Sequence, residues 1–282
     1  MNFETLIKAV KANQAKVVIH LISKEGVNVD PSQKDNKAIG LTSWFGYADI
    51  VKVLLNDSRV DLSNNKWPML WATQNNRVDV IKLLLANSKV NPAINNNYPI
   101  RYASTYNYID IVKLLLADSR INPSTVDNSA IKWASMMGNI EIVKMLLNDS
   151  RVDPSAANNF AIGMASRYGR IEIVKLLLND SRVNPSAGDN YAIRMASEHG
   201  HTEVVKLLLN DSRVNPSAHN NYSIEWASKN GHTGVVKVLL TNSRTDPTAN
   251  NNFAIRTALA NGHIEILKLL KAHQKLKLSK VS

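Results

Sequence analysis

Histidines that recur at a fixed spacing are the residues of this sequence with the clearest potential for chemistry. Residues 198–201 read EHGH, and His232 and His263 follow His201 in steps of 31 residues. A zinc ion needs three or four ligands within about 2.0–2.3 Å of one point, whereas stacked helices lie about 8–10 Å apart. Because these histidines fall in separate copies of a repeated unit, they cannot share one ion. We therefore expect no metal site.

Motifs for catalysis or cofactor binding are absent from the sequence. There is no cysteine, which excludes thiolate chemistry and disulfides. There is also no glycine-rich phosphate loop, no HExxH and no nucleophile elbow. Nearly every Asp and Glu falls in a loop or at the outward end of a helix, so we expect no enclosed titratable group. The sequence thus predicts a protein that is not an enzyme and uses no cofactor.

A repeat of about 31 residues organises almost the whole chain. A proline opens most copies, and a deletion near Asn64-Asn65 shortens one copy to 30 residues. The opening residues are Pro31, Leu62 (in place of proline), Pro92, Pro123, Pro154, Pro185, Pro216 and Pro247. A fixed period of this length indicates a stacked array in which each unit contacts mainly its neighbours.

Each copy is interpreted as two short antiparallel helices and a loop. In the copy that starts at Pro185, we expect the side chain of Asn190 to cap the first helix and Gly200 to end that helix in the left-handed conformation. The second helix, 202–210, is apolar over nearly its whole circumference, so it must be buried on several sides. Only Glu203 and Lys206 are left to face solvent.

These features resemble the ankyrin repeat family. Gly-His followed by EVVKLLL resembles the second half of an ankyrin repeat, and AIRMAS at 192–197 is similar to that family's Thr-Pro-Leu-His-x-Ala-Ala. The Thr-Pro and His are replaced here, the Asp-x-x-Gly turn is absent, and the unit is about two residues shorter than the usual 33. The loop phrase N-D-S-R-V-(N/D)-P-S-A is similar to ankyrin arrays found in giant DNA viruses and amoebae.

The repeat and the resemblance together predict an all-α, ankyrin-like solenoid of about nine stacked helix pairs joined by short loop fingers. We expect one solenoid over residues 1–273, with an N-terminal capping unit at 1–30, seven repeats at 31–246 and a C-terminal capping unit at 247–273. Residues 274–282 are predicted to be a basic tail. In the first unit, the apolar residues of the second helix, Val17 and Ile19 included, are expected to point inward.

No run of apolar residues approaches the roughly 18 that a membrane helix needs. The N-terminus also lacks the apolar core of a signal peptide. We therefore expect a soluble, intracellular monomer with no membrane contact, located in the cytoplasm (that of the host, if the chain is viral).

Two positions near the end of each first helix vary between copies, although the flanking positions are nearly fixed. In ankyrin repeats these positions lie on the concave surface, so the resemblance implies that they and the loop tips bind a protein partner. Aromatic and Met side chains, which are enriched in interfaces, concentrate at these positions in the earlier copies. Random drift of exposed residues would produce the same variability. The predicted partner-binding residues are Trp44, Phe45, Gln74, Asn75, Thr105, Tyr106, Met136, Met137, Arg167, Tyr168, Glu198 and His199.

Large side chains recur at two other positions of the repeat, and we interpret both sets as parts of the packed structure. Trp71 and Trp133 occupy a position that should face the neighbouring first helix. Trp67 shares its position with Tyr98 and with an aromatic residue in most later copies. We expect both columns to pack in the core.

The net charge of +11 leaves an alternative function open. A basic column runs through the loops, and five lysines follow Glu265. The column comprises Arg59, Lys89, Arg120, Arg151, Arg182, Arg213 and Arg244. Most of its members lie two residues after an aspartate, which favours solvated charge over a stripe that follows phosphates. Binding of nucleic acid or an anionic surface is the alternative to a protein partner, and it predicts a steep loss of affinity with salt.

Overall fold

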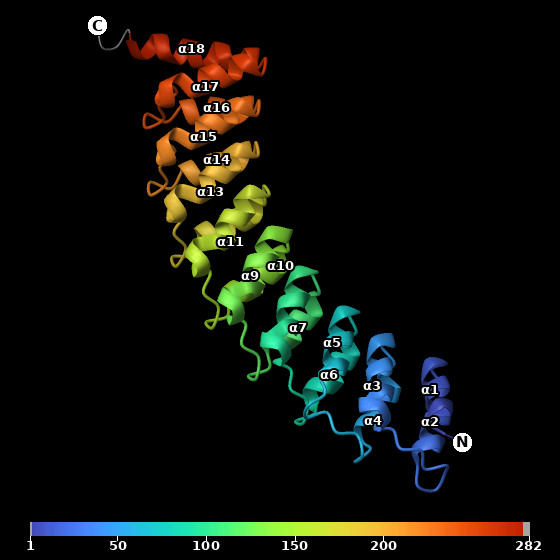
Figure 1. The fold of residues 1–282 in the computed structure, drawn as a ribbon. Coiled ribbons are helices and arrows are strands. Elements are labelled where there is room, and N and C mark those ends of the chain that lie inside the picture. The colour runs from blue at the N-terminus through green and yellow to red at the C-terminus, as the bar shows by residue number, and fades with distance from the viewer. Residues whose placement is uncertain (1, 279–282) are drawn as a thin grey trace. The chain divides into compact units, whose positions relative to one another are not determined.

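The structure, a computed structural model, describes residues 2–278 and their side chains up to residue 275, and it is all-α over this range (Figure 1). Eighteen helices follow one another as pairs, which we number as repeats 1–9, and the described residues contain no strand. The pairs are α1 (Phe3–Lys11) and α2 (Ala15–Ile22), α3 (Gln33–Phe45) and α4 (Ala48–Leu55), α5 (Trp67–Gln74) and α6 (Val78–Ala86), α7 (Ile94–Thr105) and α8 (Ile109–Leu116), α9 (Thr125–Met137) and α10 (Ile140–Leu147), α11 (Ala156–Arg167) and α12 (Ile171–Leu178), α13 (Ala187–Glu198) and α14 (Thr202–Leu209), α15 (Ala218–Lys229) and α16 (Thr233–Leu240), and α17 (Ala249–Ala260) and α18 (Ile264–Leu278). The predicted all-α fold of about nine helix pairs is confirmed.

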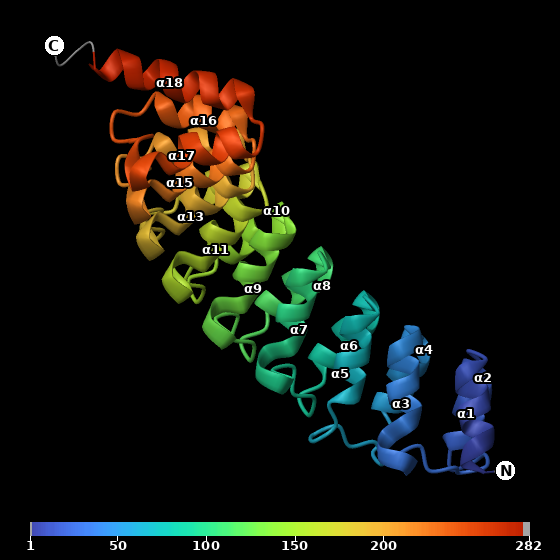
Figure 2. The same cartoon turned by 45° about the horizontal axis from the view of Figure 1, so that its top comes forward.

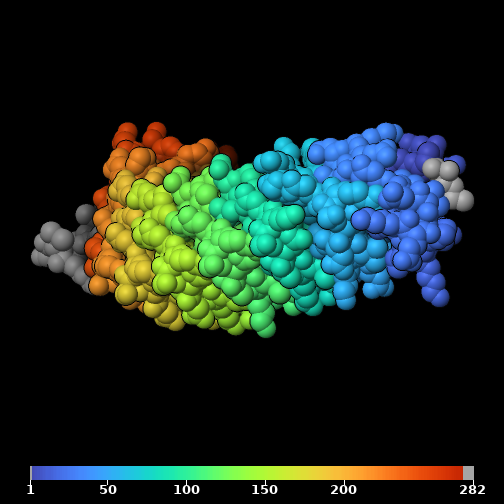
Figure 3. Space-filling model, turned by 90° about the horizontal axis from the view of Figure 1, so that it is seen from below, coloured from blue at the N-terminus to red at the C-terminus, as the bar shows by residue number. Residues whose placement is uncertain are grey.

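The described residues group into two compact units that meet in the sequence between Ala130 and Ile131. In the first unit, α1, α3, α5 and α7 pack successively against one another, and α2, α4, α6 and α8 form a second row. In the second unit, α11, α13, α15 and α17 form one row, and α10, α12, α14, α16 and α18 form the other. Each unit is therefore a two-layered stack of helices (Figure 2). Within each unit the surfaces of successive repeats form adjacent bands (Figure 3).

The core of each repeat lies between its two helices and the next repeat. In repeat 7, Ile193 of α13 and Val205 and Leu208 of α14 are completely buried. The opposite side of α14 is exposed, and there Lys206 Nζ lies 2.7 Å from Glu203 Oε1. The predicted buried and exposed faces of the second helix are thus confirmed.

The first helices end as the sequence predicts. Gly200 has a φ of 80°, and asparagine takes the same conformation where it replaces glycine, with a φ of 61° at Asn107. These are the two residue types that tolerate left-handed backbone best.

The loops between repeats contain a left-handed turn that the sequence did not predict. In repeat 7, Gly188, Asp189 and Asn190 have φ values of 60°, 56° and 60° before the right-handed helix begins. Seven repeats contain such a triplet of residues, and each triplet ends in asparagine. These asparagines are Asn36, Asn97, Asn128, Asn159, Asn190, Asn221 and Asn252. Single residues adopt this backbone readily, but a run of three is unusual for L-amino acids.

The expected N-cap at Asn190 is wrong for the same reason. Its side chain is buried, and its Oδ1 accepts a hydrogen bond from the backbone N–H of Asn215, in the loop that leads to the next repeat, at 2.6 Å. Asn159 and Asn221 make the equivalent bonds to Asn184 and Asp246. The asparagine therefore holds the loop that leads to the next repeat instead of capping its own helix.

The structure corrects several further details of the prediction. Val17 and Ile19 of α2 are exposed and do not point inward. Trp67 and Trp133, expected in the core, are also exposed. At the other end of the chain, α18 continues through the first part of the expected tail to Leu278. The rest of that tail, 279–282, lies outside the described residues.

Candidate partner-binding site

The predicted partner-binding residues lie at the ends of the first helices, beside the turn to the second helix. Each pair follows a fully buried residue such as Ser43 or Ser104. The next positions on the helix turn away from that buried side, because successive residues point in different directions around the axis. The first unit contains the predicted residues up to Tyr106, and the second unit contains those from Met136 onward.

Exposure distinguishes members of the predicted set. In the first unit, Trp44 is 44% and Tyr106 53% exposed. Phe45 is partly buried and stacks on Tyr47, with ring centroids 5.3 Å apart. Thr105 is partly buried as well. Trp44 and Tyr106 are therefore the predicted residues of this unit that a partner can cover most fully.

Gln74 and Asn75 are partly occupied by internal contacts. Gln74 Nε2 donates to the hydroxyl of Tyr98 at 3.0 Å. Asn75 Nδ2 donates to the carbonyl of Trp71 at 2.8 Å. Both side chains are half-buried; the Gln74 bond joins repeats 3 and 4, whereas the Asn75 bond stays within repeat 3.

Aromatic contacts surround Trp44 in the first unit. Its ring meets Trp71 of the next repeat edge-on, with centroids 6.0 Å apart, and Trp67 lies 5.4 Å from Trp71. Gly40 makes this packing possible, because a Cβ there would lie 2.7 Å from Cζ3 of Trp71. Packed aromatic neighbours hold these rings in fixed orientations, and Trp44 and Trp67 still present much of their surface to solvent.

A ladder of tyrosines continues the aromatic surface along α7. The ring of Tyr102 lies 5.3 Å from that of Tyr98 and 4.3 Å from that of Tyr106. Burial and the neighbouring tyrosines raise the pKa of the Tyr102 hydroxyl, so it stays neutral. α5 and α7 contain no Asp or Glu, and Lys66 Nζ lies 5.2 Å from the ring centroid of Trp67. This face is therefore aromatic and positively charged.

In the second unit, Met137, Tyr168 and His199 are exposed, whereas Met136, Arg167 and Glu198 are partly buried. Glu198 Oε2 accepts a hydrogen bond from the Tyr222 hydroxyl at 2.6 Å. Burial, together with this carboxylate, raises the pKa of Tyr222 to about 12. His199 Nδ1 lies 3.0 Å from the carbonyl oxygen of Met195, within its own helix.

The recurring histidines connect repeats. His201 Nε2 lies 2.8 Å from the carbonyl oxygen of Arg167, and His232 and His263 make the equivalent contacts one and two repeats later. Because a carbonyl only accepts, Nε2 is the donor. Burial lowers the pKa of His201. Across the described residues, no group of three or more His, Asp and Glu side chains converges as a metal site would require.

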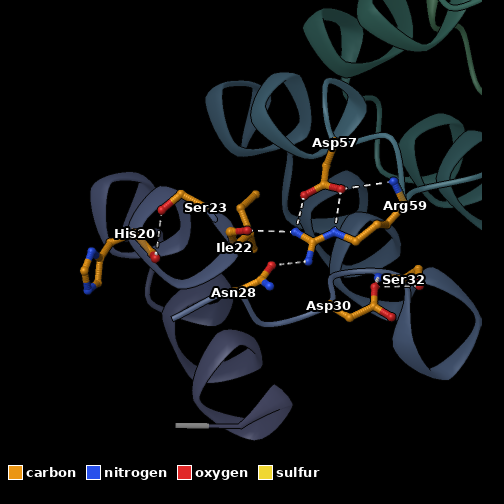
Figure 4. Close-up of polar contacts among 8 residues, drawn as sticks. All are labelled: His20, Ile22, Ser23, Asn28, Asp30, Ser32, Asp57 and Arg59. Carbon is orange, nitrogen blue, oxygen red and sulfur yellow. Dashed lines mark hydrogen bonds and ion pairs between the residues drawn. The ribbon is translucent and has the colours of Figure 1, made fainter. Parts of the chain in front are cut away.

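The arginines of the basic column are held in place by specific contacts (Figure 4). The Arg59 guanidinium forms a two-pronged pair with Asp57, at 2.8 and 2.5 Å. It also donates to the carbonyl of Ile22 at 2.7 Å and to Oδ1 of Asn28 at 2.9 Å, both in the preceding repeat. The interpretation of this column as solvated loop charge is therefore incomplete, since the side chain joins two repeats.

Later repeats keep this arrangement. Arg182 pairs with Asp180 and donates to the carbonyls of Val152 and Leu147. The hydrogen bond from Arg182 lowers the pKa of Asp180 below its ordinary value. Arg120, Arg213 and Arg244 also donate to backbone carbonyls of the preceding repeat.

Glu225 is a buried carboxyl group, contrary to the expectation of no enclosed titratable group. It is 6% exposed, its Oε1 has no hydrogen-bond partner, and burial raises its pKa although Asn250 and Arg256 act in the opposite direction. At the equivalent positions, Arg101 and Arg194 donate to carbonyls of their own left-handed turns. Glu225 thus places a carboxyl group where these arginines place a donor, and Gly163 at the equivalent position of repeat 6 places no side chain.

Comparisons with known proteins agree with this architecture. The family model described as ankyrin repeats (3 copies) matches residues 40–127, 69–158, 100–189, 131–220, 162–252 and 193–280. A search of curated proteins returned no match. None of the described helices is long and apolar enough to span a membrane. Because the matched segments together run from residue 40 to residue 280, the chain belongs to the ankyrin repeat family.

Proposed function

We propose that the chain is a non-catalytic scaffold that binds a protein partner through its first-helix face and its loop tips. Ankyrin repeats generally serve as protein–protein interaction modules. The observation that carries the proposal for this chain is the exposure of Trp44 and Tyr106 among packed aromatic neighbours. We also expect the chain to act as an intracellular monomer.

Packed aromatic side chains suit this role for energetic reasons. Most of the binding energy of an interface comes from a few residues, often Trp and Tyr, that bury a large area. The rings of Trp44 and Tyr106 are already oriented by Trp71 and Tyr102, so little side-chain freedom is lost on binding.

The test is a pair of double variants compared against a partner captured from lysate and identified by mass spectrometry. Trp44→Ala/Tyr106→Ala should weaken capture markedly, because truncation of an aromatic anchor typically costs about 2 kcal/mol or more. Its thermal melting curve should stay close to wild type, since both side chains are about half exposed and lie outside the core.

Lys229→Ala/Asn261→Ala is the control at the later variable positions. Loss of binding in the control pair with retention in the aromatic pair would place the site at the other end of the chain.

The salt dependence of binding tests the alternative function, binding of a nucleic acid or an anionic surface. An aromatic interface should respond little to salt, whereas binding to phosphates falls steeply. Because the arginines of the basic column are engaged in contacts within the protein, they give the nucleic-acid alternative no additional support.

A further inference from the structure

Exposed apolar side chains gather where α10 and α12 begin in the second unit. Ile140 and Ile171 are the first residues of these helices, and each is 36% exposed. Met137 and Tyr168, three residues earlier in each repeat, are 44% and 46% exposed. A hollow of about 330 Å³ lies between the two repeats and is lined by Gly138, Ile140, Gly169, Arg170, Ile171, Glu172 and Ile173. We call it the Ile140–Ile171 hollow.

Arg170 gives the lining of this hollow a positive charge, and Arg167 lies three residues before it in the sequence. Arg170 Nε donates to the carbonyl of Met136 at 3.1 Å, and the Arg167 guanidinium lies 6.0 Å from the ring centroid of Tyr168. Neither arginine pairs with a carboxylate of the described residues. Glu172 is already paired, with Lys175 Nζ 2.7 Å from its Oε1. The hollow therefore combines apolar walls with Arg170, which lacks an acidic partner, and with Glu172, which is paired with Lys175.

The fold itself does not require these side chains. In repeats 7 and 8 the position of Ile171 is held by Thr202 and Thr233, and both helices form normally. His201 occupies the position of Arg170 and makes the same bond to the preceding repeat. Glu198 occupies the position of Arg167. Single exposed isoleucines recur at this position as Ile109 and Ile264, but repeats 5 and 6 place two of them side by side with an arginine.

We propose that the Ile140–Ile171 hollow binds a short segment of a partner protein that presents one large apolar side chain next to Asp or Glu. This rests on the proposed function and names the class of partner. The apolar side chain would be removed from water between the two isoleucines. A carboxylate beside it would pair with the planar guanidinium of Arg167 or Arg170, which a basic segment could not do. A nucleic acid could pair with the arginines but has no aliphatic side chain to fill the hollow.

The experiment is selection of a random dodecapeptide phage library on the full chain, followed by affinity measurement with the selected peptides. We expect peptides that carry a large apolar residue adjacent to Asp or Glu. Ile140→Thr/Ile171→Thr should weaken their binding about tenfold or more, a loss of about 1.4 kcal/mol. Arg167→Glu/Arg170→His should weaken it at least as much. All four new residues occur at the same positions in repeat 7 or 8, so the variants should fold, which circular dichroism checks.

Ile264→Thr is the matched control, because Ile264 holds the same position in repeat 9 with His263 and Asn261 beside it. It should leave peptide binding unchanged. The inference is overturned if the selected peptides lack acidic residues, if they bind the isoleucine double variant as well as wild type, if only an oligonucleotide competes at this site, or if no peptide is selected. Peptides that lose binding only in Trp44→Ala/Tyr106→Ala would overturn this inference and leave the proposed function standing.

Discussion

At the scale of single residues, Arg182 shows how one side chain holds neighbouring repeats together. Its guanidinium pairs with Asp180 in its own loop and donates to the carbonyls of Val152 and Leu147, 30 and 35 residues earlier. Charge-assisted and two-pronged hydrogen bonds of this kind are stronger than neutral ones. The exposed pair of Lys175 and Glu172 lies on the outside of the same repeat and joins nothing else.

We predict that Arg182→Met lowers the free energy of unfolding by about 1–3 kcal/mol, because it removes the guanidinium donors of Asp180 and of two carbonyls. Lys175→Met should change it by no more than about 0.5 kcal/mol, as expected for an exposed ion pair. Urea denaturation of the two variants measures both values. Equal effects would show that the arginine column does not hold repeats together.

At the scale of secondary structure, the left-handed turn explains the composition of the loops. Three consecutive residues with positive φ favour Asn, Asp and Gly, and the turns contain many of them. Val126 is an exception, with a φ of 53°. It is β-branched and its side chain is half exposed, so it is strained without a compensating buried contact.

Val126→Gly should therefore raise the free energy of unfolding by about 1 kcal/mol, because glycine has no Cβ to clash in this conformation. Glycine already holds the equivalent position in repeat 7, at Gly188. Lys113→Gly, on the exposed side of α8, is the control and should lose about 1 kcal/mol through helix propensity. Urea midpoints that fall for both variants would contradict a left-handed turn at Val126.

The helices and their ends could be predicted from sequence because each depends on local spacing. The apolar period gave the buried face of α14, and Gly200 or its asparagine equivalents gave the helix end. The left-handed turn could not be predicted, because asparagine is common both as an N-cap and in left-handed backbone. Asn190 fits both roles in sequence, and only its contact with Asn215 decides between them.

Part of the candidate site could also be predicted from the sequence. The sequence placed Trp44 and Tyr106 at variable positions, and both are exposed. It could not show that Gln74 bonds to Tyr98, or that Ile140 and Ile171 enclose a hollow. Such contacts join residues about one repeat apart, and their geometry depends on how the repeats pack.

At the scale of the whole molecule, the aspartates of the loops link stability to pH. Hydrogen bonds from arginine lower the pKa of five of them in the folded state, at positions spread over both units. These are Asp57, Asp118, Asp149, Asp180 and Asp211. A carboxylate with a lowered folded pKa stabilises the fold above its unfolded pKa, and this stabilisation is lost as pH falls through the folded value. Glu225 has the opposite shift, so its contribution is present at low pH and is lost as pH rises through its folded pKa.

With the five arginine-bonded aspartates acting against one glutamate, we predict that the free energy of unfolding falls most steeply below about pH 4, near the unfolded pKa of aspartate. The lowered pKa of His201 adds a smaller loss of stability as pH falls below the ordinary histidine pKa. Urea denaturation across this range tests the prediction. Asp180→Asn should be less stable than wild type at neutral pH, and the difference should shrink in acid as Asp180 itself becomes protonated. Glu225→Gln should lose less stability than wild type as pH rises from acid to neutral. A wild-type midpoint that does not move between about pH 5 and pH 3 would show that the aspartate–arginine pairs contribute little to the stability of the array.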